Sequence, residues 1–344
     1  MLLTSTLMSE SIEFQPDLTA QPFSEAGGLT LRSRFLGGLW GAVVADALGV
    51  PVEFRTRASL DADPVVDLRA FGTYQQPRGT WSDDSSLLLC TLDAYLQPTF
   101  ALSQVAARFV RYLDEAFMTP HGRVFDIGFT TRDAIERLRS GCAPELAGGH
   151  AEQDNGNGSL MRILPVALAT PYVADDVLAD AAHRLSRLTH GHARSQLACG
   201  YYCLLARGLL LGLPFQDAYH RASETALHLY AGPEWASELP VYARVLSGSL
   251  AHVPRADIKS TGYVVHTLEA AIWCVLSTAS YRDAVLQAVN LGDDTDTVAC
   301  IAGGLAGLLY GVDAVPLDWR EALARAPELA DWFARFADRS LPPR

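Results

Sequence analysis

The sequence has little that would direct it to a nucleic acid or to an anionic membrane. Among its 344 residues, lysine and arginine together number 27 against 39 aspartate and glutamate, and the net charge is −12. An acidic surface repels phosphate backbones and anionic lipids unless a local basic pocket intervenes. We therefore expect neither nucleic acid nor a membrane among the partners of this protein.

Cysteine is scarce, and its spacing matches no zinc or redox motif. The six cysteines include no CxxC pair, and most of them lie in apolar runs, where a reduced cysteine behaves as a small hydrophobic residue. Cys199 and Cys203 are spaced i,i+4 on one predicted helix, but no second ligand pair completes a zinc site. Free thiols suit a reducing compartment, so we expect a cytoplasmic protein.

Signals for secretion and for membrane insertion are also missing. Residues 1–30 contain no basic segment ahead of an apolar stretch, as a signal peptide would. The most apolar window, residues 197–213, includes Arg207 and falls short of the roughly 20 apolar residues that a transmembrane helix needs. We interpret this window as a buried helix of the core.

Strand signals are few and short, such as residues 64–68, whereas helical patterns fill the chain. From Arg32 until Pro51 the residues are small or apolar on most faces, as in a buried helix. We predict an all-α fold with one compact multi-helix domain over residues 32–344, preceded by an irregular extension over residues 1–31. Further helices are expected over residues 83–96, 102–117, 130–139, 176–188, 193–213, 215–230, 264–279, 282–290, 296–310 and 319–337, the last broken at Pro327.

Two acidic clusters stand at the starts of apolar helices. The first, RGTWSDDSSLLLC at residues 78–90, has two adjacent aspartates, and the second, NLGDDTDTVAC at residues 290–300, has three. A helix N-terminus stabilises a nearby anion, but one capping side chain is enough, and Ser82 or Thr295 alone would serve. Five aspartates on two helices this apolar exceed what capping requires.

Binding of a hard cation explains the acidic clusters better. Mg²⁺ and Mn²⁺ prefer carboxylate, hydroxyl and water oxygens. Two clusters far apart in sequence can meet in one helical core, where they offer enough oxygens for two ions that share a bridging carboxylate. Glu53, just after the first helix, could supply another oxygen. Without cations, burying so much negative charge would be very costly.

A glycine-rich segment, EQDNGNGSLMRILP at residues 152–165, lies between the clusters. Gly156 and Gly158 free the backbone, and a turn of this kind entering a helix can cradle a phosphate, although an ordinary loop explains it equally well. Arg162 could pair with a phosphate or with a buried carboxylate. The hydrogen-bonding side chains of the turn are Asn155, Asn157 and Ser159.

Three further polar residues have weaker signals. His190 and His192 precede the helix predicted from residue 193, and isolated histidines are more often structural than catalytic. Asp126 lies in a turn within FDIGFTTRDA, and by itself it is an ordinary helix cap.

Taken in order, seven segments resemble the ADP-ribosylglycohydrolase family, which includes the dinitrogenase reductase-activating glycohydrolase. They span about residues 35–311 and read LGGLWGAVVADALGVPVEF, GTWSDDSSLLL, FDIGFTTR, NGNGSLMRILPVAL, LTHGHA, GYVVHTLEAAIWCVL and AVNLGDDTDTVACIAGGLAGLLYG. The resemblance implies an all-α fold with a centre of two Mg²⁺ or Mn²⁺ ions. It implies hydrolysis of the bond between ADP-ribose and a modified side chain, with arginine favoured by the bacterial members.

The resemblance also assigns site residues. The implied metal ligands are Ser82, Asp83, Asp84, Asp294, Asp296 and Thr297. The residues expected to bind ADP-ribose are Gly156, Asn157, Gly158, Ser159 and His190. The candidates for the catalytic acid and base are Glu53, Asp83, Asp84 and Asp126, without an assignment among them. Two positions depart from the family: Ser82 replaces the usual threonine but keeps the hydroxyl, and Phe129 replaces a frequent asparagine, which puts substrate contacts near that turn in doubt.

Two other functions were weighed. All-α isoprenoid synthases also use two aspartate-rich Mg²⁺ sites. However, their first site typically has a further carboxylate three or four residues after the first pair, and this chain has Ser86 to Leu88 there, so the match is poor. Alternatively, the chain is an immunity protein that blocks a cognate ADP-ribosyltransferase toxin by inserting residues 1–31 into its active site. Inhibition of a toxin and hydrolysis could coexist in one protein.

Overall fold

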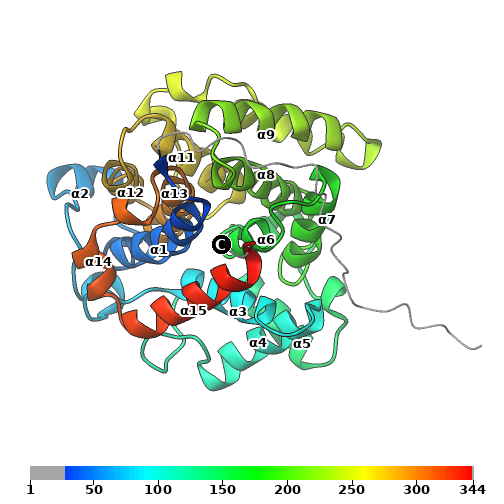
Figure 1. Ribbon diagram of the computed structural model, residues 1–344, viewed down its shortest axis with the longest axis horizontal. Coiled ribbons are helices and arrows are strands. Elements are labelled where there is room, and N and C mark those ends of the chain that lie inside the picture. The colour runs from blue at the N-terminus through cyan, green and yellow to red at the C-terminus, as the bar shows by residue number, and fades with distance from the viewer. Residues whose placement is uncertain (1–27, 343–344) are drawn as a thin grey trace, which may run out of the picture.

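Helices account for all the regular secondary structure in residues 28–342, the part of the chain that the computed structural model describes (Figure 1). The predicted all-α fold is therefore confirmed. The extension predicted over residues 1–31, with its proposed contact to a toxin, lies almost wholly outside the described residues. The α-helices are α1 (Leu31–Gly49), α2 (Arg57–Ala62), α3 (Asp83–Tyr95), α4 (Leu102–Glu115), α5 (Phe129–Arg139), α6 (Leu164–Ala169), α7 (Asp175–Ser186), α8 (Ala193–Leu210), α9 (Phe215–Leu229), α10 (Ala243–Leu246), α11 (Val264–Leu276), α12 (Tyr281–Val289), α13 (Thr295–Tyr310), α14 (Leu317–Ala322) and α15 (Ala326–Ser340).

Every helix predicted from apolar periodicity is present, whereas the short helices α2, α6 and α10 were not predicted. The strand signal at residues 64–68 is wrong, because this segment is irregular chain. The break predicted at Pro327 occurs earlier, over residues 323–325. Pro327 instead lies in the first turn of α15, where its missing N–H costs no hydrogen bond.

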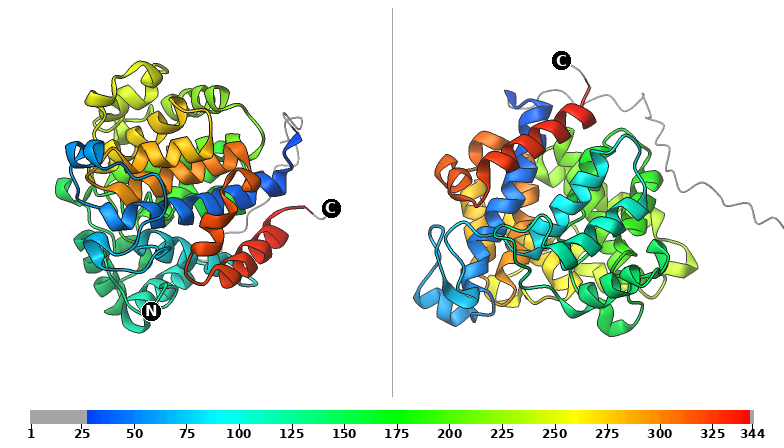
Figure 2. Two further views of the ribbon diagram at one scale, coloured as in Figure 1. Left: turned by 90° about the vertical axis from the view of Figure 1, so that its left-hand side faces the viewer. Right: turned by 90° about the horizontal axis from the view of Figure 1, so that it is seen from below.

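Helices α1 and α13 pack side by side at the centre of the fold, although they come from opposite ends of the sequence (Figures 1 and 2). The two backbones are so close that a Cβ atom added at Gly41 would lie 2.3 Å from the carbonyl oxygen of Gly303. At the end of α1, a Cβ added at Gly49 would lie 2.3 Å from the Cα of Asp296. Only glycine permits this approach, which brings the end of α1 against the start of α13 and its acidic cluster.

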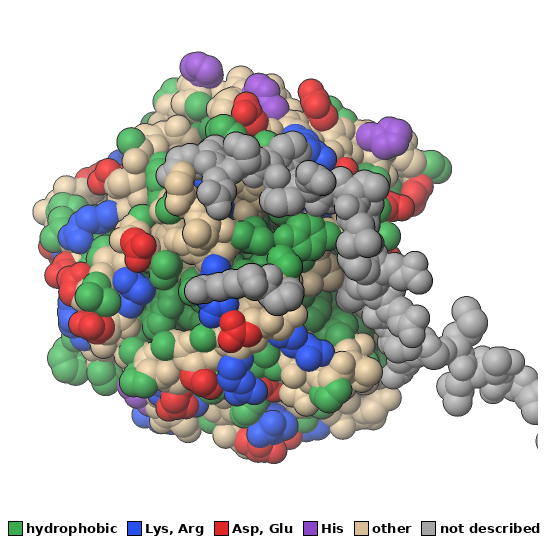
Figure 3. All heavy atoms as spheres, in the orientation of Figure 1, with side chains coloured by type: hydrophobic (Ala, Val, Ile, Leu, Met, Phe, Trp, Pro, Cys, Tyr) green, Lys and Arg blue, Asp and Glu red, His purple; other side chains and the backbone are tan. Residues whose placement is uncertain are grey.

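Helix α1 and the turn after it, Leu31–Val52, are long and apolar enough to cross a membrane, with a mean hydropathy of 1.6. However, 94% of that window is buried inside the protein, so α1 serves as a core helix here. The apolar window at residues 197–213 forms most of α8 and is buried as predicted. On the face shown in Figure 3, acidic and basic side chains are interspersed over the described residues.

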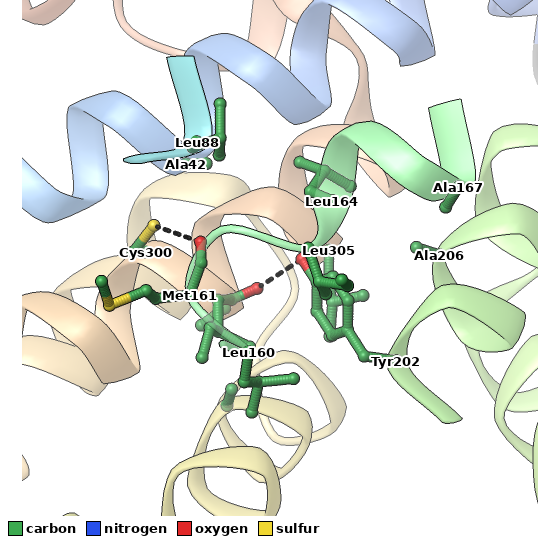
Figure 4. Packing of buried hydrophobic residues seen from close by; sticks show 14 of the residues in the cluster. Ala42, Leu88, Leu160, Met161, Leu164, Ala167, Tyr202, Ala206, Cys300 and Leu305 are labelled. Atoms are coloured by element: carbon green, nitrogen blue, oxygen red, sulfur yellow. Dashed lines mark hydrogen bonds between the residues drawn. The ribbon is translucent and has the colours of Figure 1, made fainter. Parts of the chain in front are cut away.

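The glycine-rich segment is anchored in this core (Figure 4). Met161 follows the glycines, and its carbonyl oxygen accepts a hydrogen bond from the thiol of Cys300 on α13 at 3.8 Å. Leu164 at the start of α6 packs with Leu305 of α13 and Tyr202 of α8. The thiols of all six cysteines are free, and five of them are buried, as expected of small core residues.

Candidate active site

One cavity of about 570 Å³ gathers residues from every predicted motif. It opens where the starts of α3, α5 and α13 meet the glycine-rich turn. Its lining includes Glu53, Asp83, Asp84, Asp126, Phe129, Gly156, Asn157, Gly158, His190, Asp294 and Thr297. Segments that are far apart in sequence therefore build a single site.

The first acidic cluster begins α3. Ser82 is the N-cap, and its hydroxyl accepts a hydrogen bond from the backbone N–H of Asp84 at 3.2 Å, as predicted for a cap. Asp46, fully buried on α1, holds this turn from below by accepting the N–H groups of Ser82 at 2.9 Å and Ser85 at 3.0 Å. The sequence analysis missed Asp46, and the only signal was an acid inside an otherwise apolar helix.

The second cluster begins α13 and meets the first. The hydroxyl of Thr297 donates to the carboxylate of Asp84 at 3.3 Å. One carboxylate oxygen each from Glu53, Asp294 and Asp296 lies within 4.8 Å of the others. Thr295 does not cap the helix as expected. Its hydroxyl donates to the carbonyl oxygen of Gly49 and so fixes α13 against α1.

The loop that carries Glu53 is tied to the second cluster by its backbone. The N–H of Phe54 donates to the carbonyl oxygen of Asp293 at 2.7 Å, and the N–H of Asp293 donates to the carbonyl oxygen of Arg55 at 2.9 Å. Phe54 and Asp293 both have positive φ angles, 63° and 60°, which non-glycine residues adopt at some energetic cost. This strained pairing holds Glu53 beside Asp294 and Asp296, whereas the exposed Asp293 itself stays out of the cavity.

The donor set fits a divalent metal ion. In the part of the chain that the structure describes, one oxygen in each of four carboxylates is buried without a hydrogen-bond partner, and a buried carboxylate oxygen left in this state is costly. Oxygens of carboxylates and hydroxyls are the ligands that Mg²⁺ and Mn²⁺ prefer. The acidic cluster can therefore hold a metal ion. The four oxygens belong to Glu53, Asp84, Asp294 and Asp296.

Burial and mutual repulsion make these acids weak in the absence of a cation. Burial, together with the charges of Asp126 and Asp294, raises the pKa of Glu53 to about 10. Burial also raises the pKa values of Asp83 and Asp296 well above the usual range of an aspartate, and neighbouring carboxylates add to the effect. A bound divalent cation has the opposite influence, because it favours the ionised carboxylates.

Asp126 lies at the cavity wall rather than at a helix cap. The N-cap of α5 is Gly128, so the interpretation of Asp126 as an ordinary cap is wrong. Its φ angle of 61° turns the chain so that the carboxylate accepts a hydrogen bond from the hydroxyl of Tyr74. Burial and the charge of Asp126 raise the pKa of Tyr74, so the phenol stays protonated and donates. Tyr74 ends a short 3-10 helix, Gly72–Tyr74, and nothing in the sequence pointed to it.

The glycine-rich turn contributes to the cavity through the side chain of Asn157 and through the backbone of Gly158. The amide nitrogen of Asn157 donates to Asp294 at 2.8 Å and to the hydroxyl of Thr267 at 3.0 Å, which places Asn157 beside the acidic cluster. A Cβ atom at Gly158 would lie 2.9 Å from Cε1 of His190. Ser159 does not line the cavity, because its hydroxyl is buried in the core and accepts a hydrogen bond from Ser186.

The other singled-out residues have structural positions. His192 is the N-cap of α8, where its ring accepts from the N–H of Arg194 at 3.2 Å. Within the described residues, Arg162 does not pair with a buried carboxylate, which was one of its two expected partners. Its side chain is fully buried, and both of its hydrogen bonds go to uncharged oxygens. Phe129 stands at the rim of the cavity with 89% of its surface exposed.

Comparisons with known proteins agree on one family. A family model described as ADP-ribosylglycohydrolase matches residues 28–343. ADP-ribosylarginine hydrolase Tri1 from Pseudomonas putida is 33% identical over 336 residues, which cover 94% of this chain and 86% of that protein. ADP-ribosyl-[dinitrogen reductase] glycohydrolase from Rhodospirillum rubrum is 29% identical, over 86% of this chain and 92% of that protein. A solved structure described as an ADP-ribosylglycohydrolase-related protein complex is 31% identical, with a TM-score of 0.74 over 90% of this chain and 99% of that one.

Proposed function

Because the chain belongs to the ADP-ribosylglycohydrolase family, we propose that it hydrolyses the N-glycosidic bond between ADP-ribose and an arginine side chain of a modified protein. The observation that carries the proposal is the oxygen-only cluster of Glu53, Asp294 and Asp296, of which Glu53 and Asp294 line the cavity. Arginine is the favoured linkage because relatives from Pseudomonas putida and Serratia proteamaculans are both described as ADP-ribosylarginine hydrolases. The reaction reverses mono-ADP-ribosylation.

The proposed cofactor is a pair of Mg²⁺ ions, or Mn²⁺ in their place. The support is the set of partnerless carboxylate oxygens and the hydrogen bond that joins Thr297 to Asp84 across the two clusters. When bound, such ions neutralise the acids and polarise oxygen atoms of the substrate or of water. The residues that would hold them are Ser82, Asp83, Asp84, Asp294, Asp296 and Thr297.

The remaining acids of the cavity suit proton transfer. Cleavage of the glycosidic bond leaves positive charge on the ribose, which nearby carboxylates stabilise. The attacking water must lose a proton and the departing guanidine must gain one. We assign these transfers to Glu53 and Asp126, because both line the cavity and both interact with Tyr74. Asp83 and Asp84, also predicted as catalytic, are assigned to the cations.

A hydrolysis assay tests this function directly. Proteins or peptides that carry ADP-ribose on arginine, on serine or on a nucleobase are incubated with the full chain, either with Mg²⁺ or after exhaustive chelation. We expect release of ADP-ribose from the arginine linkage with Mg²⁺ and none after chelation. Failure to release it from arginine would overturn the substrate, and full activity after chelation would overturn the cofactor.

Two earlier expectations stay predictions. The inhibition of a toxin concerns residues 1–31, almost all of which lie outside the described residues, and no contact within residues 28–342 favours it. The cytoplasmic location rests on cysteine usage alone.

A further inference from the structure

Arg162 is a buried cation with no carboxylate paired to it among residues 28–342. Its side chain is fully buried, and its guanidinium stands over the ring of Phe109 at 4.7 Å from the centroid. Nη2 donates to the carbonyl of Leu185 at 3.1 Å and to the hydroxyl of Thr189 at 2.7 Å. Nε and Nη1 find no hydrogen-bond partner among the described residues. Burying a charge in this state is expensive, so its presence calls for a function.

The hydroxyl of Thr189 connects Arg162 by hydrogen bonds to His190, which lines the cavity. A guanidinium can only donate hydrogen bonds, so this hydroxyl must act as the acceptor towards Arg162. Its own proton is then free for a second partner. Within the described residues that partner is Nδ1 of His190, at 2.9 Å. With Nδ1 as the acceptor the buried hydroxyl proton is paired as well, and this arrangement places the proton of the neutral imidazole on Nε2.

A charged imidazole does not fit this arrangement. Protonated His190 would direct a second cationic N–H group at a hydroxyl that already accepts from Arg162. The ring is only 2% exposed, and burial together with the charge of Arg162 lowers the pKa of His190 to about 3. His190 is thus neutral at physiological pH, with one donor in a fixed position.

That donor faces the glycine-rich turn. Nε2 of His190 lies 3.4 Å from the place that a Cβ atom would take at Gly156, and equally far from the place at Gly158. A side chain at either position would fill the space in front of Nε2. Within residues 28–342, the backbone N–H of Gly158 also has no protein acceptor. His190 and Gly158 both line the cavity, so two donors lie in the same part of it, as an anionic oxygen requires.

We propose that Arg162 and Thr189 are positioning residues, which hold His190 as an Nε2–H donor to a phosphate oxygen of bound ADP-ribose. The identity of the ligand rests on the proposed function, whereas the tautomer of His190 does not. In the series of hydrogen bonds from Arg162 through Thr189 to His190, each donor is polarised by the one before it. The series places a hydrogen-bond donor polarised by a positive charge in a cavity whose lining includes five carboxylates.

The tautomer is tested by NMR on the metal-free full chain labelled with ¹⁵N-histidine, in which His190→Asn identifies the signals of this residue. We expect the Nε2–H form in the wild-type protein and in Thr189→Ser, which keeps the hydroxyl. Thr189→Val removes it, and we expect the ring to populate both tautomers. Thr170→Val is the matched control, because Thr170 is also buried but donates to a helix carbonyl elsewhere.

Ligand binding is measured on the same variants with ADP-ribose by calorimetry. We expect Thr189→Val to weaken binding about tenfold, the effect of losing one well-aligned hydrogen bond to a charged group. Thr189→Ser and Thr170→Val should bind within about twofold of the wild type. With ADP-ribosylated arginine as substrate, KM should rise in Thr189→Val while kcat changes less than about twofold, because Thr189 touches no reacting atom.

The possible results separate the two proposals. An Nδ1–H tautomer in the wild-type protein, or an unchanged tautomer and affinity in Thr189→Val, would overturn the positioning role and leave the proposed function standing. If the wild type shows the Nε2–H tautomer but does not bind ADP-ribose, the ligand assignment fails together with the proposed function. If Thr189→Val does not fold, the wild-type tautomer and a comparison with Thr189→Ser still decide the question.

Discussion

The carboxylates of the site differ in how many of their oxygens accept hydrogen bonds from the protein. Both oxygens of Asp46 accept backbone N–H groups from the start of α3, whereas Oδ2 of Asp296 has no hydrogen-bond partner within residues 28–342. The first arrangement is that of a structural anchor, and the second is that of a ligand that awaits a cation. Substitution by asparagine, which keeps the shape and removes the charge, should therefore have opposite consequences at the two positions.

Asp296→Asn should abolish activity without weakening the fold. We expect at least a hundredfold loss of kcat/KM, because a metal ligand is lost. The metal-free variant should melt at or above the wild-type temperature, since one of several repelling acids has been neutralised. Addition of Mg²⁺ should raise its melting temperature less than that of the wild type. Asp93→Asn, which breaks an ion pair with Arg108 elsewhere on α3, is the control and should keep full activity. Wild-type activity in Asp296→Asn would contradict the metal site.

Asp46→Asn should mainly reduce stability. The amide has a single acceptor oxygen, and its NH₂ group would face the N–H groups of Ser82 and Ser85. We expect a loss of about 1–3 kcal/mol in the free energy of unfolding, measured by urea denaturation of the metal-free protein. Affinity for Mg²⁺ should also fall, because Asp83 and Asp84 stand on the loosened turn. Unchanged stability would show that Asp46 does not anchor α3.

The helices owe their arrangement to glycine as much as to apolar residues. The glycines of α1 and α13 allow the two axes to approach until backbone meets backbone, and this approach aligns the acidic starts of α3 and α13 on α1. A larger residue at the contact must push one helix away. Since the proposed metal ligands lie at the ends of these helices, a shift in packing is also a shift in the site.

Gly41→Ala and Gly49→Ala test this coupling. Each added methyl group would lie 2.3 Å from backbone atoms of α13, so we expect destabilisation of about 1–3 kcal/mol or more in thermal or urea melts. Gly49→Ala should also lower activity strongly, because it displaces Asp296. Gly128→Ala is the control for stability, since a methyl group there would meet nothing within 4 Å. If all three variants melt alike, the close helix contact is not required.

Features with a local signal could be predicted from the sequence. Apolar periodicity predicted the long helices, and runs of acids at helix starts predicted acidic clusters that meet in the fold. Prediction failed where a residue acts through a partner distant in sequence. Asp46, Tyr74 and Thr189 have ordinary neighbours along the chain, and only the fold brings them to Ser82, Asp126 and Arg162. Short helices such as α6 were also missed, because six residues give too little periodicity.

The protein as a whole concentrates buried negative charge at one end of its central helix pair and surrounds it with apolar core. In the absence of cations this design opposes folding, because folding takes several carboxylates out of water and brings them together. Protons relieve the repulsion when no metal ion is present. Stability, pH and metal binding should therefore be linked.

Metal-free protein should lose stability as pH rises, and Mg²⁺ should remove much of this dependence. The pKa of Glu53 rises from 4.5 to about 10 on folding, so the folded state holds a proton that the unfolded state has lost between these pH values. This contribution to stability is greatest below pH 4.5 and falls as pH increases, by about 1.4 kcal/mol per pH unit for each such proton. Bound Mg²⁺ displaces these protons, so its stabilising effect should grow with pH.

The measurement compares urea midpoints of the full chain from pH 5.5 to 8.5, once with chelator and once with saturating Mg²⁺. Buried histidines such as His183, whose pKa is lowered to about 3 by burial, give the opposite slope, but they contribute equally to both curves and cancel in their difference. We expect the two curves to diverge with rising pH in the wild type and to diverge less in Asp296→Asn. Parallel curves in the wild type would show that the buried acids do not exchange protons for a cation, and the metal centre would have to be sought elsewhere in the molecule.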